Sequence, residues 1–245
     1  QFIRKPRNGD IWVTTLIGDK SMFSYYGTKK KLSKNYPKPS YGTIIEPFAG
    51  AAMYSLFDDN WKNEVILNDK YDKVFNAWNY LINKATLSDI KGLPKLTQGL
   101  KLNDLNLSED EKDLLGFYAN PSSAVPKKTV TKRGEISWER HHNFLINNLH
   151  KIKHWKVYNK SYDELDNIKG TWYIDPPYEK QGIYYKHNSK TINYKELGEW
   201  CLSRKGEIIV CENMGATWLD FKPLVDLIGQ TQNTQTEAIF YKKNT

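Results

Sequence analysis

The run Asp175-Pro176-Pro177-Tyr178 carries the most specific chemical signal in the sequence. It directly follows an apolar stretch at residues 171–174, which we expect to form a strand. Two successive prolines fix φ and remove two backbone donors, so this loop offers carbonyl oxygens beside a carboxylate that only accepts hydrogen bonds. Acceptors without donors suit an NH2 group. An ordinary turn at the end of a strand is the less specific interpretation.

Tyr178 and the acceptors before it together suit one kind of substrate, a nucleobase with an amino group. The amino nitrogen of adenine is a poor nucleophile because its lone pair is conjugated with the ring. Acceptors on its hydrogens favour a more localised lone pair, and Asp175 and the carbonyl of Pro176 are the candidates. Tyr178 offers a face for a base pulled out of its duplex, a contact worth on the order of 1–3 kcal/mol.

A second stretch, Glu46-Pro47-Phe48-Ala49-Gly50, follows another apolar strand candidate at residues 43–46. Small residues there let the backbone approach a ligand beside a helix N-terminus. The phosphate-loop pattern GxxxxGK[ST] is absent, as are the later glycines of a dinucleotide fingerprint. Asp69 ends the next strand about 20 residues on, where a carboxylate can accept hydrogen bonds from ribose hydroxyls. These residues predict an adenosine-containing cofactor, although Gly50 can simply serve a turn and Asp69 can cap a helix.

The elements that must position these residues alternate between strands and helices. Before residue 85, we expect strands at 43–46 and 64–67 and helices at 51–57 and 71–83. After residue 154, we expect strands at 155–158, 171–174, 207–211 and 237–241 and a helix at 194–202. Repeated units of this kind predict an α/β fold, with a mainly parallel sheet covered on both faces. In such sheets, ligands bind at the carboxyl ends of the strands.

Residues 85–154 interrupt this alternation with short helical pieces and a basic run. We interpret them as an inserted lobe within a catalytic domain made of residues 1–84 and 155–245. The candidate nucleic-acid-binding side chains are Lys127, Lys128, Lys132, Arg133 and Arg140, in the company of Trp138, His141 and His142. A solvated basic face is the alternative. We expect no metal site, because His150 and His154 lack an HExxH motif and a nearby cysteine.

The overall charge agrees with a polyanionic partner. The chain has 36 Lys and Arg residues against 28 Asp and Glu residues, a formal net charge of +8. No stretch approaches the roughly 18 apolar residues that a membrane helix needs. Residues 1–5 lack the order of a secretory signal, and Cys201 and Cys211 show no paired spacing. We therefore expect a cytoplasmic protein without a membrane partner.

With these stretches identified, the chain resembles the Dam-like, D12 class adenine-N6 DNA methyltransferases in their α arrangement. Residues 23–29, Phe-Ser-Tyr-Tyr-Gly-Thr-Lys, are similar to the family's amino-terminal cofactor motif, usually Trp-Ala-Gly-Gly-Lys. Residues 46–50 resemble its Glu-Pro-Phe-x-Gly segment, Asn68-Asp69 its acidic turn, and residues 175–178 its catalytic loop. The chain departs from the family at Tyr25, which replaces Trp, and at Ala51-Ala52 after Gly50.

The resemblance implies a Rossmann-like sheet that uses S-adenosylmethionine, yields S-adenosylhomocysteine, and methylates N6 of a flipped adenine by direct transfer. It makes residues 175–178 catalytic and residues 85–154 a target-recognition lobe. The cofactor residues that it implies are Tyr25, Lys29, Glu46, Pro47, Phe48, Ala49, Gly50, Asp69 and Asp163. Lys29 can instead belong to a solvated or phosphate-facing cluster with Lys30 and Lys31, and Asp163 competes with the adjacent Glu164.

Two other functions fit the same residues. An RNA adenine-N6 methyltransferase needs the same loop chemistry, because nothing in the sequence reads a 2′-hydroxyl. A catalytically inactive nucleic-acid-binding relative is the third possibility. Double-stranded DNA is the partner that the resemblance implies, in a bacterial or phage-infected cell, with a monomer as the favoured state. Pairing with a restriction endonuclease and the recognition sequence stay open.

Overall fold

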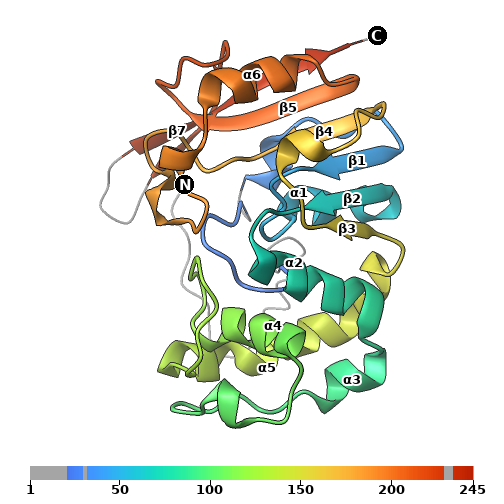
Figure 1. Ribbon diagram of the computed structural model, residues 1–245, viewed down its shortest axis with the longest axis vertical. Coiled ribbons are helices and arrows are strands. Elements are labelled where there is room, and N and C mark those ends of the chain that lie inside the picture. Colours follow the sequence, from blue (N-terminus) through green and yellow to red (C-terminus); the bar gives the residue numbers. More distant parts are fainter. Residues whose placement is uncertain (1–20, 30–31, 229–233, 245) are drawn as a thin grey trace, which may run out of the picture.

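A seven-stranded sheet with helices on both sides organises the described part of the computed structural model, residues 21–29, 32–228 and 234–244 (Figure 1). Residues 1–5, for which we expected no secretory signal, lie outside the described residues. So do Lys30 and Lys31, which the sequence grouped with Lys29. The strands are β1 (Thr43–Glu46), β2 (Glu64–Asn68), β3 (Lys156–Tyr158), β4 (Gly170–Ile174), β5 (Gly206–Asn213), β6 (Lys222–Ile228) and β7 (Thr234–Lys243). Their order in the sheet is β3-β2-β1-β4-β5-β7-β6.

The strand directions confirm the prediction of an α/β, Rossmann-like fold with a mainly parallel sheet. Strands β3, β2, β1, β4 and β5 are parallel neighbours, whereas β7 runs antiparallel to both β5 and β6. The sequence did not predict β6, since Pro223 lies within it and proline cannot donate a ladder hydrogen bond. Among the described strands, β6 pairs only with β7, at the edge of the sheet, and its register shifts beside Pro223.

The helices are α1 (Met53–Leu56), α2 (Asp72–Asn79), α3 (Leu87–Gly92), α4 (Glu109–Ala119), α5 (Lys132–Asn148) and α6 (Tyr194–Leu202). A π-helical turn at Tyr80–Lys84 continues α2. Helix α1 is shorter than the expected helix at residues 51–57, because Ala52 adopts the left-handed conformation with φ 47° and the helix begins only after it. No described helix is both long and apolar enough to cross a membrane.

Successive side chains along the strands enter different cores on the two faces of the sheet. Ile44 and Tyr173 belong to a core that includes residues of α2, α4 and α5. Their neighbours Ile45 and Trp172 belong to a second core with residues of α6. This period of two is the expected geometry of strands covered on both faces. The continuous apolar runs that predicted β1, β4 and β5 follow from it.

Helices α3, α4 and α5 lie together at the end of the molecule beyond α2 and β3 (Figure 1). Phe117 of α4 and Leu145 of α5 are fully buried and share one core with Trp78 of α2. Residues 85–154 are thus mostly helical and packed on the sheet's own core rather than around a separate one. Their role as an inserted recognition lobe stays a prediction.

Two of the three aromatic residues singled out in this helical segment do not lie where the sequence placed them. Trp138 and His141 are buried, and His142 stacks on Trp138 with ring centroids 4.8 Å apart. The Nε2 atom of His142 lies 2.6 Å from the carbonyl oxygen of Ile90 in α3. The expectation that Trp138 and His141 accompany the basic residues on a nucleic-acid surface was wrong, because both are buried against Tyr118 of α4, whereas His142 is half-buried.

Candidate active site

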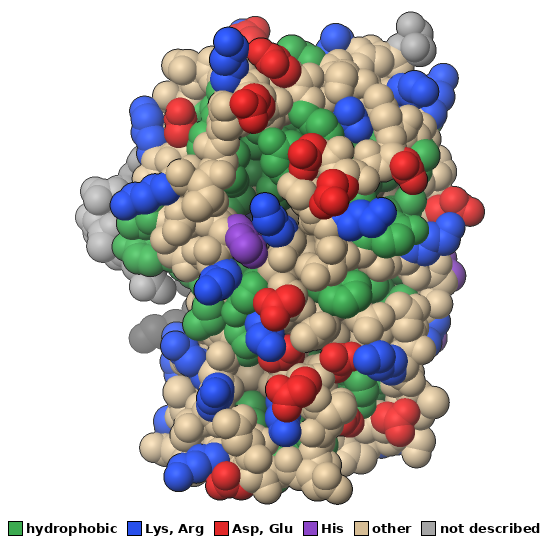
Figure 2. All heavy atoms as spheres, in the orientation of Figure 1, with side chains coloured by type: hydrophobic (Ala, Val, Ile, Leu, Met, Phe, Trp, Pro, Cys, Tyr) green, Lys and Arg blue, Asp and Glu red, His purple; other side chains and the backbone are tan. Residues whose placement is uncertain are grey.

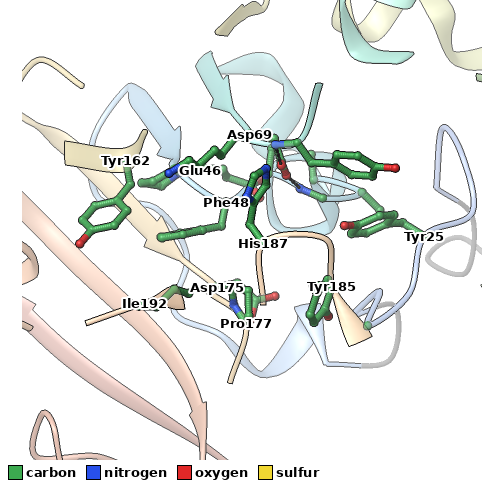
Figure 3. Close-up of a pocket in the computed structure, with 18 of the residues that line it drawn as sticks. Tyr25, Glu46, Phe48, Asp69, Tyr162, Asp175, Pro177, Tyr185, His187 and Ile192 are labelled. Carbon is green, nitrogen blue, oxygen red and sulfur yellow. Dashed lines mark hydrogen bonds between the residues drawn. The ribbon is translucent and has the colours of Figure 1, made fainter. Parts of the chain in front are cut away.

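A cavity of about 290 Å³ opens at the carboxyl ends of β1, β2 and β4. The chain runs from β1 outward to β2 and β3 and then returns to β4 on the other side of β1. Connections leave β1 and β4 in opposite directions there, which is where parallel sheets bind ligands. Figure 3 shows Asp69, Glu46 and Phe48 on one side of the cavity and Asp175 and Pro177 on the opposite side. The cavity therefore brings together the two stretches singled out by the sequence.

Gly50 shapes the wall formed by the loop after β1. Its φ is +45°, and a Cβ atom on it would lie only 3.2 Å from the ring of Tyr25. Glycine adopts such a conformation without steric cost and lets the backbone approach a ligand. The Gly50 N–H donates a hydrogen bond of 3.0 Å to Asp69, which ties the loops after β1 and β2 together.

Asp69 lies at the end of β2 and lines the cavity. One oxygen accepts the Gly50 N–H, and the other accepts the Tyr71 N–H at 2.9 Å. Burial raises the pKa of Asp69 to about 6. The helix-cap alternative was wrong, because Tyr71 holds the cap position of α2. Since a carboxylate has about four lone-pair sites, Asp69 keeps acceptor capacity for a ligand.

The remaining candidate cofactor residues differ in how they meet the cavity. Pro47, Phe48 and Ala49 line it beside Gly50, and the Phe48 ring lies 5.4 Å from that of Tyr162. Glu46 also lines it but accepts a hydrogen bond from the Ser55 N–H of α1, and burial raises its pKa to about 8.

The turn after β3 offers two adjacent carboxylates, which the sequence could not rank. Asp163 lines the cavity. Glu164 accepts the backbone N–H of Ser161 at 2.7 Å, as the last member of a capping box. Of the two, Asp163 is therefore the one available to a ligand in the cavity.

The catalytic-loop candidates follow β4 directly, where Asp175 and Pro177 line the cavity and Pro176 is buried. The carbonyl of Pro177 accepts a hydrogen bond from the Tyr194 hydroxyl of α6. Burial raises the pKa of Asp175 to about 6, against the opposing effect of the Lys29 ammonium. Tyr178 is half-buried, and its hydroxyl donates to Glu237 of β7.

Lys29 lies in the cavity wall, but its ammonium contacts the catalytic loop. Its Nζ atom lies 3.5 Å from Asp175 and 3.1 Å from Glu237, and it also donates to the Tyr178 hydroxyl. Burial lowers the pKa of Lys29, yet the two carboxylates outweigh burial and hold it above its ordinary value. The solvated-cluster alternative was wrong for Lys29, whose side chain is 13% exposed.

Several cavity residues were missed by the sequence-based prediction. Tyr185, Lys186 and His187 line it from the loop after the catalytic run, where closely spaced aromatic and basic residues were the available signal. Ile192 and Asn193 line it just before α6. Glu237 had no comparable signal, since it is the one acidic residue in an otherwise ordinary strand.

All five basic candidates of the helical segment are exposed: Lys127, Lys128, Lys132, Arg133 and Arg140. Figure 2 shows acidic and basic side chains mixed over most of one face, with basic ones predominant along the left edge of its lower half. The loop that precedes them is joined to the cavity rim, because the Tyr26 N–H donates to the Ser123 carbonyl at 3.2 Å. Lys132 forms an ion pair with Glu135 at 2.7 Å.

Comparison with known families places this geometry in context. The model of the D12 class N6 adenine-specific DNA methyltransferase family matches residues 25–207. The match includes Lys29, the loop after β1, Asp69 and the whole catalytic run, and it ends before β7. A search of individual curated proteins gave no match.

Proposed function

The chain belongs to the D12 class N6 adenine-specific DNA methyltransferases, which use S-adenosylmethionine, and we propose that Asp175, Pro176, Pro177 and Tyr178 are its catalytic residues. The observation that supports this assignment is their position. The run follows β4 at the sheet's switch point, and its Asp175 and Pro177 line the same cavity as Gly50 and Asp69. Methyl donor and acceptor nitrogen must meet in one place, and this cavity offers groups for both.

The residues on the Asp69 side of the cavity fit S-adenosylmethionine. We propose that Asp69 accepts hydrogen bonds from its ribose, that Phe48 packs against its adenine, and that Asp163 lies near the adenine edge. Gly50 leaves room that a Cβ atom would fill, and Tyr25, Lys29, Glu46, Pro47 and Ala49 complete the wall. When bound, the cofactor supplies an electrophilic methyl group on a sulfonium.

On the opposite side, Asp175 and the Pro176 carbonyl would accept the two hydrogens of the adenine amino group. The Pro177 carbonyl already accepts the Tyr194 hydroxyl, so we assign this role to the Pro176 carbonyl, although Pro177 is the proline that lines the cavity. Fixed acceptors of this kind need no reorganisation during the reaction. After transfer the nitrogen must lose one proton, and the Asp175 carboxylate, already hydrogen-bonded to it, is the first protein group able to take it.

We also propose that Lys127, Lys128, Lys132, Arg133 and Arg140 contact DNA phosphates and that residues 85–154 read the target sequence. Support comes from their exposure and from the backbone link between Ser123 and Tyr26 at the cavity rim. Neutralising the four basic residues between 127 and 133 should make DNA binding less dependent on salt, by about 0.9 in log–log slope for each phosphate that the protein no longer neutralises. An unchanged slope would leave these residues as a solvated face.

The cellular setting follows from the substrate rather than from the cavity. We propose that the protein acts on double-stranded DNA in the cytoplasm of a bacterial or phage-infected cell. We further propose that it acts as a monomer, since one chain supplies every group assigned above. A cognate restriction endonuclease is a further candidate partner.

Methyl transfer to unmodified DNA and RNA, followed by nucleoside analysis, tests the proposal. We expect N6-methyladenine in DNA, at sites that share a sequence. Methylation of RNA without methylation of DNA would overturn the choice of substrate. Methylation of DNA that survives in the Asp175→Ala variant would overturn the assignment of the catalytic loop.

A further inference from the structure

Glu237 joins three parts of the active site although it lies outside the segment that matches the family. It is 2% exposed and follows the start of β7, beside Asn213 at the carboxyl end of β5. Its Oε1 atom accepts hydrogen bonds from the hydroxyls of Tyr178 and Tyr36, the latter at 2.8 Å. The ammonium of Lys29 lies 3.1 Å from the same oxygen and 3.4 Å from Oε2.

Lys29 faces two carboxylates and is closer to Glu237 than to Asp175, whose Oδ1 atom is 3.5 Å away. An ammonium carries three donors and would compete for the lone pairs of any carboxylate that it faces. At Asp175 that competition matters, because the proposed chemistry needs those lone pairs for the adenine amino group. Glu237 provides the alternative partner.

We propose that Glu237 is a positioning residue for methyl transfer: it retains the Lys29 ammonium and the Tyr178 hydroxyl, so that Asp175 stays free to accept from the substrate. This inference rests on the proposed role of Asp175. It gives β7 a role in the reaction, because folding brings Glu237 of this strand to the active site. Glu237 itself does not touch the reacting atoms.

The charges around Asp175 give this role a signature in the pH profile. The groups that act on Asp175 or are acted on by it are Lys29, Tyr36, Glu46, Tyr173, Tyr178, Tyr185, Cys211, Glu212 and Glu237. Among them, Lys29 lowers the pKa of Asp175 and Glu237 raises it. Without the charge of Glu237, both effects move the pKa of Asp175 downward, because Lys29 then has Asp175 as its remaining carboxylate.

The test is the Glu237→Gln variant, assayed for single-turnover methyl transfer to DNA between pH 5 and 9 and for cofactor binding by calorimetry. We expect the rate constant to fall roughly 10- to 100-fold, as when a reacting group is displaced by a fraction of its contact distance. We expect the acid limb of the profile, near pH 6 in the wild type, to move to lower pH. Cofactor affinity should stay unchanged.

Two further variants separate positioning from simple support of the fold. Glu237→Asp keeps the charge and should restore most of the rate and the wild-type acid limb, and it also serves if Glu237→Gln does not fold. Glu207→Gln removes another fully buried glutamate of the same sheet, which lies at the amino end of β5 and does not line the cavity, and should leave both rate and profile unchanged.

Two other outcomes contradict the inference. A normal rate in Glu237→Gln would show that Asp175 does not need this partner. A lower rate constant in Glu237→Gln without a shift of the acid limb would show that Glu237 only supports the fold. Absence of methylation in the wild type as well would instead refute the proposed function, so the two failures are distinguishable.

Discussion

Buried carboxylates at the two ends of the sheet have pKa values shifted in opposite directions. At the amino end, Glu207 accepts the Ser40 N–H and hydroxyl and the hydroxyls of Thr171 and Tyr241, at 2.7 to 2.9 Å. Burial raises its pKa, but these donors outweigh burial and leave it below its ordinary value. At the carboxyl end, burial raises the pKa of Asp175 and Asp69 to about 6.

The difference lies in how many donors the protein itself provides. Glu207 is saturated by side chains and backbone from the starts of β1 and β4 and from β7, so its charge links these strands. Asp69 and Asp175 keep acceptor sites that the fold does not fill. A buried acceptor without full partners is costly in the free protein, which is why raised pKa values often mark ligand sites. One end of the sheet therefore serves stability, and the other is where we propose that binding and chemistry take place.

The strongest way to break this comparison is Asp175→Ala. If the carboxyl end serves chemistry, the rate of methyl transfer should fall by at least roughly 10³-fold, the upper range for loss of one preorganised hydrogen-bonding group. Cofactor affinity should stay near normal, because Asp175 lies on the side of the cavity opposite Asp69. Single-turnover assays and calorimetry measure the two quantities. A comparable loss of both would mean that the variant disturbs the whole cavity.

Tyr178→Ala should have the next largest effect. Loss of the aromatic face should reduce kcat/KM on duplex DNA about 10- to 100-fold, as expected for a stacking contact of about 1–3 kcal/mol. Tyr178→Phe serves as the matched control, since it keeps the ring and removes only the hydroxyl that bonds Glu237. An unchanged kcat/KM in Tyr178→Ala would remove this residue from substrate binding.

Glu207→Gln should lower the stability of the fold and leave the rate of methyl transfer unchanged. An amide presents two hydrogens to a site built from donors, so the free energy of unfolding should fall by about 1–3 kcal/mol. Denaturant unfolding measures that change, and methyl transfer by the folded variant should proceed at the wild-type rate. A loss of activity without a loss of stability would erase the distinction between the two ends.

The last prediction concerns how the stability of the fold depends on pH. Glu46 has a pKa of about 8 in the folded protein against an ordinary value of 4.5, so the native state binds more protons than the unfolded state between these values. The free energy of unfolding should then decrease as pH rises through this window, by at most about 1.4 kcal/mol per pH unit for this group. Glu46→Gln should flatten the dependence measured by thermal unfolding between pH 5 and 8. An unaltered slope would indicate that Glu46 is charged in the native state.

Much of the sheet could be predicted because buried parallel strands are short apolar runs. That signal located β1, β2, β4 and β5, and their order explains why residues following different strands share one cavity. Strand β6 was missed because Pro223 breaks its pattern, and α1 was predicted too long because nothing in Ala51-Ala52 indicates a left-handed residue. The position of β6 and the start of α1 depend on tertiary packing, so the local sequence does not predict them.

The residues of the candidate site also fall into a group that the sequence could predict and a group that it could not. Gly50, Asp69 and Asp175 could be proposed as neighbours because each lies in the connection that leaves the carboxyl end of a strand of one sheet. Lys29 and Glu237 could not be paired, since that requires knowing that β7 inserts antiparallel between β5 and β6. Only this insertion brings the beginning of β7 to the carboxyl end of its neighbours.

The place of β7 has a consequence for how the enzyme is made. Lys29 and Glu237 are 208 positions apart, and β7 follows the other six described strands in the chain yet lies between two of them. During synthesis at about 5–20 residues per second, the amino-terminal strands can assemble many seconds before β7 emerges from the ribosome. Until it does, Lys29 has Asp175 as its available carboxylate partner. The nascent protein should therefore be able to bind cofactor before it can methylate, and activity should begin only when β7 enters the sheet.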